Sequence, residues 1–115
     1  MSVRLNTRQV GDVVVVDVSG RITLGEGSST LREGIRELLA KGHRKILLNL
    51  ADVSYIDSSG IGELVSAYTS VTNAGGQLKL VNLTKRVNDL LQITKLYTIF
   101  DIYDNELTAI RSFAS

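Results

Sequence analysis

LNLADVSYIDSSGIG, residues 48–62, is the stretch of this chain that decides its fold. An apolar strand ends at Leu50, a short turn follows, and Asp57-Ser58-Ser59 opens a helix. The first N–H groups of a helix have no intrahelical acceptor, and they carry the positive end of the helix dipole. Two hydroxyls and a carboxylate at this point suit a helix cap, an anion site, or a serine that gains and loses a phosphate.

The rest of the chain alternates strands and helices around this stretch. Residues 3–10 and 13–18 have the pattern of strands, and the Gly-Asp pair between them predicts an antiparallel hairpin. A glycine-rich loop at 20–27 follows. Further patterns predict strands at 45–50, 78–83 and 99–103, and helices at 28–40, 59–73, 85–93 and 104–114.

Strands that are separated by helices pair in parallel through right-handed crossovers. The order of elements therefore predicts an α/β fold with a mixed sheet that opens with an antiparallel hairpin and packs with about four helices. The length of 115 residues fits a single domain over 1–115.

Composition excludes several classes of protein. Basic and acidic residues number 13 and 12, so the chain lacks the concentrated positive charge of a nucleic-acid-binding surface. The chain has no cysteine, which fits a reducing compartment. Its start does not resemble a signal peptide, and no apolar run approaches the ~18 residues of a membrane span. We therefore expect a soluble cytoplasmic protein that binds neither nucleic acid nor membrane.

Catalytic chemistry has little support in the sequence. The only histidine, His43, precedes the strand that leads to Ser58, so the two residues are expected at opposite ends of that strand. Asp57 is a poor base at neutral pH unless it is strongly desolvated. Metal ligands are sparse and scattered. We expect no catalytic residue, no metal and no cofactor.

Two other sites that use this stretch fit less well. Asp57 follows a strand, as the phosphoacceptor of a response-regulator receiver domain does, but the first strand here enters a hairpin and supplies no acidic pair for Mg²⁺. Gly60-Ile61-Gly62 is half of a dinucleotide fingerprint, but Val65 replaces the third small residue and no Walker lysine is present. The glycines then serve to let the helix start lie close to neighbouring backbone.

A helix cap alone explains only part of the Asp57-Ser58-Ser59 run. Aspartate and serine are favoured N-cap residues, and the loss of a cap costs ~1 kcal/mol. One cap is enough for one helix, so three capping residues in a row followed by Gly-Ile-Gly exceed that need.

These motifs together resemble the anti-sigma factor antagonists of the STAS domain family. The resemblance covers nearly the whole chain, and it rests on the hairpin and on four motifs: VSGRI at 18–22, residues 48–62, GGQL at 75–78 and VNDLL at 87–91. It implies a partner switch without enzymatic activity. The unphosphorylated antagonist binds an anti-sigma factor that is also a serine kinase, and so frees a sigma factor. Phosphorylation of the first serine ends binding, and a metal-dependent PP2C-type phosphatase restores it.

Carried onto this chain, the resemblance makes Ser58 the phosphorylated residue. The residues that it implies for partner binding are Asp57, Ser59, Gly60, Ile61, Gly62, Thr23 and Leu24. Because Gly60 and Gly62 have no side chains, they would let the partner approach the start of the helix closely. Thr23 stands where sporulation-type members have an acidic residue, so the resemblance leaves the choice of partner open.

Two alternatives remain open from the sequence. In a non-switching STAS scaffold or transport-complex subunit, Ser58 would be only a helix cap. A small-ligand or nucleotide-binding module would instead be stabilised by its ligand. Exposed strand edges also allow a homodimer.

Overall fold

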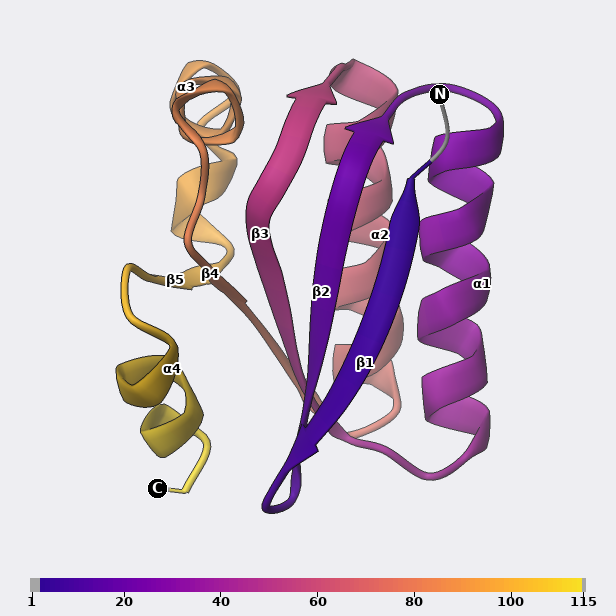
Figure 1. The fold of residues 1–115 in the computed structure, drawn as a ribbon, viewed down its shortest axis with the longest axis vertical. Helices are drawn as coiled ribbons and strands as arrows, with labels where there is room; N and C mark the ends of the chain where they lie inside the picture. The colour runs from indigo at the N-terminus through magenta and orange to yellow at the C-terminus, as the bar shows by residue number, and fades with distance from the viewer. Residues whose placement is uncertain (1–2, 115) are drawn as a thin grey trace.

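Five strands form one sheet in the computed structural model, which describes residues 3–114 (Figure 1). They lie in sequence order: β1 (Arg4–Val10), β2 (Val13–Ile22), β3 (Lys45–Ile56), β4 (Gln77–Val81) and β5 (Asp101–Tyr103). β1 pairs with β2 antiparallel through the predicted hairpin, and the other pairs are parallel. The predicted fold class is confirmed.

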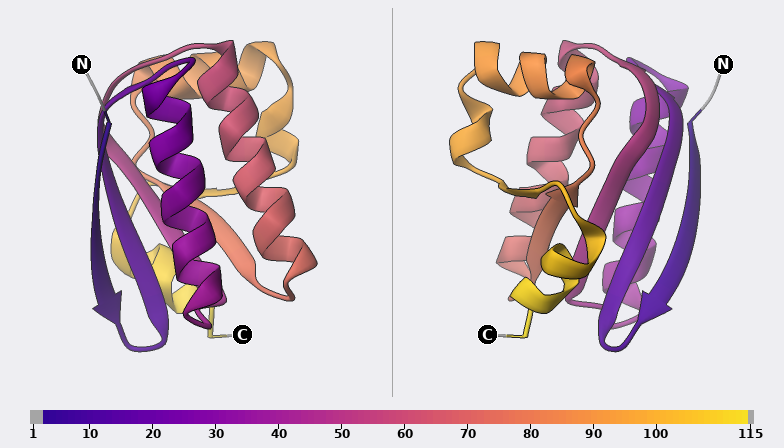
Figure 2. Two further views of the ribbon diagram at one scale, coloured as in Figure 1. Left: turned by 90° about the vertical axis from the view of Figure 1, so that its right-hand side faces the viewer. Right: turned by 60° about the vertical axis from the view of Figure 1, so that its left-hand side comes forward.

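The helices cover both faces of the sheet. Their bounds are α1 (Glu26–Ala40), α2 (Ser58–Asn73), α3 (Lys85–Ile93) and α4 (Glu106–Ser112), with a 3-10 turn, η1 (Leu96–Thr98). α1 and α2 lie side by side on one face, and α4 lies on the other, as Figure 2 shows. No helix within residues 3–114 is long and apolar enough to cross a membrane.

The valine run of β2 is buried on both faces of the sheet. Val14 and Val16 belong to the main core between the sheet and α1, α2 and α3. Val13 and Val15 point the other way, where they pack with Phe113 beneath α4. Successive strand residues alternate between the two faces of a sheet, so a continuous apolar run indicates that both faces are covered.

β3 is longer than predicted. We expected the strand to end at Leu50 in a short turn, but it continues to Ile56. Exposed Ala51 and Asp52 interrupt the apolar pattern, and pairing with the end of β2 keeps this segment extended. The register shifts twice along that pairing. The same pairing extends β2 to Ile22, so residues 20–22, which we expected in the loop, belong to the strand.

Smaller differences lie at other element ends. The helix predicted at 85–93 has the observed bounds of α3. The strand predicted at 99–103 is shorter, because η1 precedes it and β5 begins at Asp101. The last helix begins at Glu106, since Asn105 caps it by accepting a hydrogen bond from the backbone N–H of Thr108.

Gly60 lets α2 begin against the end of β2. A Cβ at this position would collide with the carbonyl oxygen of Ile22 and would lie 2.6 Å from Cγ1 of Ile56. The expected close approach to backbone is thus confirmed for Gly60. It is wrong for Gly62, where an added Cβ would meet no atom within 4 Å.

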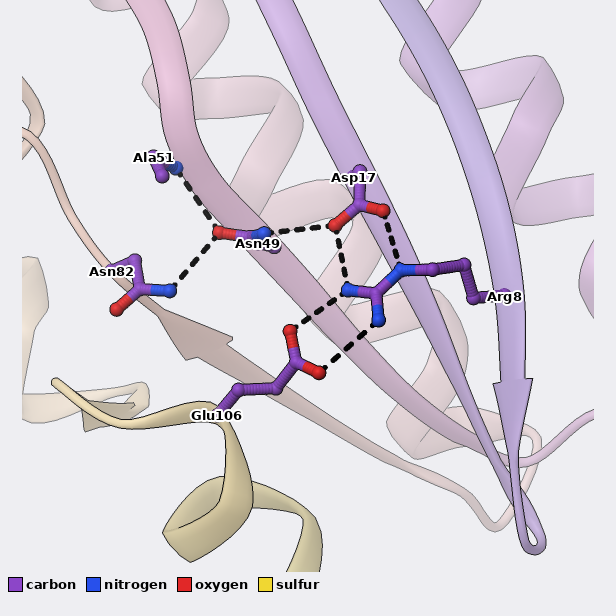
Figure 3. Close-up of polar contacts among 6 residues, drawn as sticks. All are labelled: Arg8, Asp17, Asn49, Ala51, Asn82 and Glu106. Carbon is purple, nitrogen blue, oxygen red and sulfur yellow. Dashed lines mark hydrogen bonds and ion pairs between the residues drawn. The ribbon is translucent and has the colours of Figure 1, made fainter.

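An ionic cluster joins α4 to the first two strands (Figure 3). Arg8 of β1 bonds both carboxylate oxygens of Asp17 on β2, at 2.6 and 2.9 Å. The same guanidinium bonds both carboxylate oxygens of Glu106 on α4, at 2.8 and 3.2 Å. The hydrogen bond from Arg8 is the main cause that lowers the pKa of Asp17. The cluster therefore depends on ionised carboxylates.

Amide side chains extend this cluster across the sheet. Asn49 of β3 donates to Oδ1 of Asp17 at 2.8 Å. The side-chain oxygen of Asn49, Oδ1, accepts from the backbone N–H of Ala51 at 3.2 Å and from the side-chain amide of Asn82 at 3.4 Å. Polar groups on β1, β2, β3, the end of β4 and the start of α4 are thus joined in one network (Figure 3).

Replacement of Gly60 by alanine tests the close approach at the start of α2. We expect Gly60→Ala to lower the free energy of unfolding by about 1–3 kcal/mol, because the new methyl group overpacks a fixed backbone contact. Gly62→Ala is the matched control and should raise it by about 0.5–1 kcal/mol, since alanine is the better helix former. Urea denaturation measures both values. Equal effects of the two substitutions would contradict this account.

Substitution of Asp17 tests the ionic cluster through pH. The lowered pKa means that Asp17 stabilises the fold above its unfolded pKa of about 3.9, and that this contribution is lost as pH falls through the folded value. We expect Asp17→Asn to cost about 1 kcal/mol near neutral pH and almost nothing in strong acid. Asp12→Asn removes an exposed pair with Lys45 and should cost less. A pH-independent cost of Asp17→Asn would overturn the prediction.

Candidate functional site

The candidate site lies where the ends of β2 and β3 meet the start of α2, at one edge of the sheet (Figure 1). Asp57 is the residue between β3 and α2, and its side chain holds two segments at once. It accepts from the backbone N–H of Gly60 at 2.9 Å and from that of Leu24 at 3.4 Å. Asp57 therefore caps α2 and fastens the loop after β2 to the helix start.

Ser58 is left free by this arrangement. It is the first residue of α2, its side chain is exposed, and its hydroxyl forms no hydrogen bond within residues 3–114. The helix cap that the sequence allowed for Ser58 is supplied by Asp57 instead. Neighbouring Ser59 is half-buried. Ser58 is thus the hydroxyl of this run that a second protein can reach.

The loop between β2 and α1 forms the other side of the site. The carbonyl oxygen of Thr23 accepts from both the backbone N–H and the hydroxyl of Ser28, at 3.1 and 2.9 Å. This turn displays Leu24, whose side chain is 78% exposed. Leu24 thus lies beside Asp57, and Thr23 precedes it in the same turn.

Not every residue predicted for partner binding reaches the surface. Ile61 is 3% exposed and belongs to the main core. Gly60 is buried against β2, whereas Gly62 is exposed in the first turn of α2. A partner that contacts this site therefore meets Leu24, Ser58 and Gly62, while Ile61 and Gly60 support the site from below. The prediction of Ile61 as a contact residue is wrong because its side chain points inward.

The structure adds three residues that the sequence did not indicate. The guanidinium carbons of Arg21 and Arg86 lie 4.8 and 4.5 Å from the ring centroid of Tyr55. Arg21 and Tyr55 are partners in the β2–β3 pairing, and Arg86 is the second residue of α3. The sequence offers one weak indication of these three residues: each is charged or aromatic and stands next to an apolar residue in its strand or helix.

The histidine of this chain lies away from Ser58. His43 precedes β3 and Ser58 follows it, so the 12 residues of that strand separate them and place them at its opposite ends. The predicted separation is confirmed. Within residues 3–114 no group of three or more His, Cys, Asp or Glu side chains could hold a metal ion. The geometry presents an exposed hydroxyl, and the neighbouring carboxylate of Asp57 accepts from backbone N–H groups.

Known proteins are similar to this chain in sequence and in fold. The anti-sigma-B factor antagonist of Bacillus subtilis (strain 168) is 35% identical over 102 residues, which are 89% of this chain and 92% of that protein. A crystal structure of an anti-sigma factor antagonist from Mycobacterium paratuberculosis has a TM-score of 0.86 at 20% identity, and covers 98% of this chain and 95% of its own.

The fold of SpoIIAA, a Bacillus cell fate determinant, is also similar. Its phosphorylated form has a TM-score of 0.73 at 21% identity, and covers 95% of this chain and 98% of its own. Its unphosphorylated form has a TM-score of 0.70 at 19% identity, over 95% of this chain and 96% of its own. At such identities the likeness concerns the fold. The model of the STAS domain matches residues 4–109, and with the Bacillus subtilis relative it shows that this chain belongs to the STAS domain family.

Proposed function

We propose that this protein is an anti-sigma factor antagonist whose binding is switched off by phosphorylation of Ser58. The observation that carries the proposal is the division of roles at the start of α2: Asp57 caps the helix, and the Ser58 hydroxyl is exposed and unbonded. The names of the related proteins supply the class of partner, an anti-sigma factor. A scaffold in which Ser58 serves only as a cap has less support, because the cap is Asp57.

The unphosphorylated form binds an anti-sigma factor that is also a serine kinase, and so releases a sigma factor. Its contact surface is the rim that carries Leu24, Ser58 and Gly62, flanked by the half-buried Thr23 and Ser59. The kinase transfers the γ-phosphoryl group of ATP to the Ser58 oxygen, and the complex dissociates. A PP2C-type phosphatase removes the phosphate and restores binding. The antagonist itself acts in this cycle by binding.

The physics of Ser58 supports a switch of this kind. A phosphoserine carries a charge of about −1.5 to −2 near neutral pH. At the N-terminus of α2, free N–H groups and the helix dipole stabilise that charge, so the fold tolerates the modification. A partner seated on the rim would have to desolvate the phosphate or leave it unpaired. A penalty of about 3 kcal/mol weakens binding roughly a hundredfold.

Affinity capture from the native host tests the switch. Wild-type protein, Ser58→Ala and Ser58→Asp serve as baits, and mass spectrometry identifies the captured proteins. We expect Ser58→Ala to retain a serine kinase that Ser58→Asp loses, because the carboxylate places negative charge in the interface. Ser66→Asp, which adds the same charge at an exposed position farther along α2, should retain the kinase. Identical captures by all four baits would support the scaffold and contradict the proposal.

The identity of the acceptor is tested with the captured kinase and ATP. Ser58 is exposed and Ser59 is half-buried, so we expect the kinase to modify Ser59→Ala as fully as the wild type and to leave Ser58→Ala unmodified. Intact mass and peptide mapping measure the stoichiometry and the position of the phosphate. Undiminished modification of Ser58→Ala would move the acceptor to another residue.

A further inference from the structure

A cationic cluster that the proposed switch does not use is formed by Arg21, Tyr55 and Arg86 near the end of β3. Tyr55 stands three residues before Ser58 on β3, and both guanidinium groups lie over its ring. Nε of Arg86 also donates to the carbonyl oxygen of Ile56, at 3.4 Å, next to the turn that leads into α2. We call this cluster the arginine–tyrosine stack.

No ion pair within residues 3–114 neutralises the charge of the stack. Arg21 and Arg86 are exposed, and neither forms an ion pair in the described part of the chain. The nearby carboxylates have other partners. Asp57 accepts from backbone N–H groups, and Asp89, on the same helix as Arg86, pairs with Lys85 at 2.8 Å. Arg8, in contrast, is paired with Asp17 and Glu106. The stack differs from that cluster because two unpaired guanidinium groups lie over one aromatic ring.

Two like charges are held close together in this stack. Since the guanidinium carbons lie 4.8 and 4.5 Å from one centroid, they are nearer to each other than the Debye length of about 10 Å at moderate salt. Their repulsion persists in the free protein and is relieved when an anion binds. Stacking on Tyr55 also restricts both side chains, while the N–H edges of the guanidinium groups remain able to hold carboxylates in bidentate pairs.

We propose that the arginine–tyrosine stack docks acidic side chains of the protein that binds at Ser58, so that the partner surface facing this rim is acidic. The inference rests on the proposed function and names the chemistry of its partner. Leu24, 78% exposed on the same rim, adds an apolar contact beside the charged one. An acidic partner also explains the sign of the switch, because phosphate on Ser58 brings negative charge against carboxylates and competes for the same arginines.

The test measures binding of the purified anti-sigma kinase to unphosphorylated antagonist at several salt concentrations. We expect the double variant Arg21→Gln/Arg86→Gln to bind about tenfold or more weakly near 0.1 M salt, and its affinity to depend less on salt. Arg36→Gln/Arg111→Gln is the matched control with the same net charge; it removes exposed arginines on α1 and α4, and its affinity should stay within about twofold of the wild type. Thermal melts establish that both double variants fold.

Substitutions of Tyr55 test the aromatic ring of the arginine–tyrosine stack. Tyr55→Phe keeps the aromatic face and should bind like the wild type, whereas Tyr55→Ala should weaken binding by about three- to tenfold. Unchanged affinity and unchanged salt dependence in the folded Arg21→Gln/Arg86→Gln variant would overturn the inference while leaving the switch intact. If the wild type does not bind the kinase at all, the proposed function fails and this inference falls with it. Binding of the wild type to nucleic acid instead would also overturn it.

Discussion

The contact between Gly60 and the backbone of Ile22 is the constraint on which the rest of the site depends. With no side chain at position 60, the first turn of α2 packs directly on the end of β2. That approach brings Asp57 within reach of two N–H groups from different segments. The carboxylate is then fully used as a structural acceptor. The next residue, Ser58, is left on the outside with a free hydroxyl, which is the property that a reversible phosphate acceptor needs.

Two clusters of charged residues in this molecule have different uses. Arg8, Asp17 and Glu106 are paired with one another and join α4 to the sheet, on the face opposite α1 and α2 (Figures 2 and 3). Arg21 and Arg86 share an aromatic ring and leave their charge exposed near the end of β3. Paired charges add modestly to stability and change little when a partner arrives. The unpaired charges of Arg21 and Arg86, stacked on Tyr55, attract an opposite charge, so they indicate where a partner binds.

This division also explains how a small modification can have a large effect on binding without a change of fold. The helix start stabilises a phosphate locally, through groups that exist before the modification. A partner bound at the rim meets the added charge directly, at the position where its own carboxylates face Arg21 and Arg86. The proposed switch therefore needs no rearrangement of the core. The few kcal/mol that separate bound from released states come from electrostatics at one surface.

Local patterns in the sequence determined the element order, the hairpin at Gly11-Asp12 and the bounds of α3, because caps, turns and helical spacing are encoded within a few residues. The choice of Ser58 came from the resemblance to the STAS domain family. The tertiary structure alone decided the length of β3, since Ala51 and Asp52 break the apolar pattern but are held extended by pairing with β2. It also decided that Asp57 is the cap, that Ile61 is buried, and that Arg21 and Arg86 both lie over the ring of Tyr55. Those outcomes depend on the register between distant strands and on where α3 comes to rest, and no local pattern specifies either.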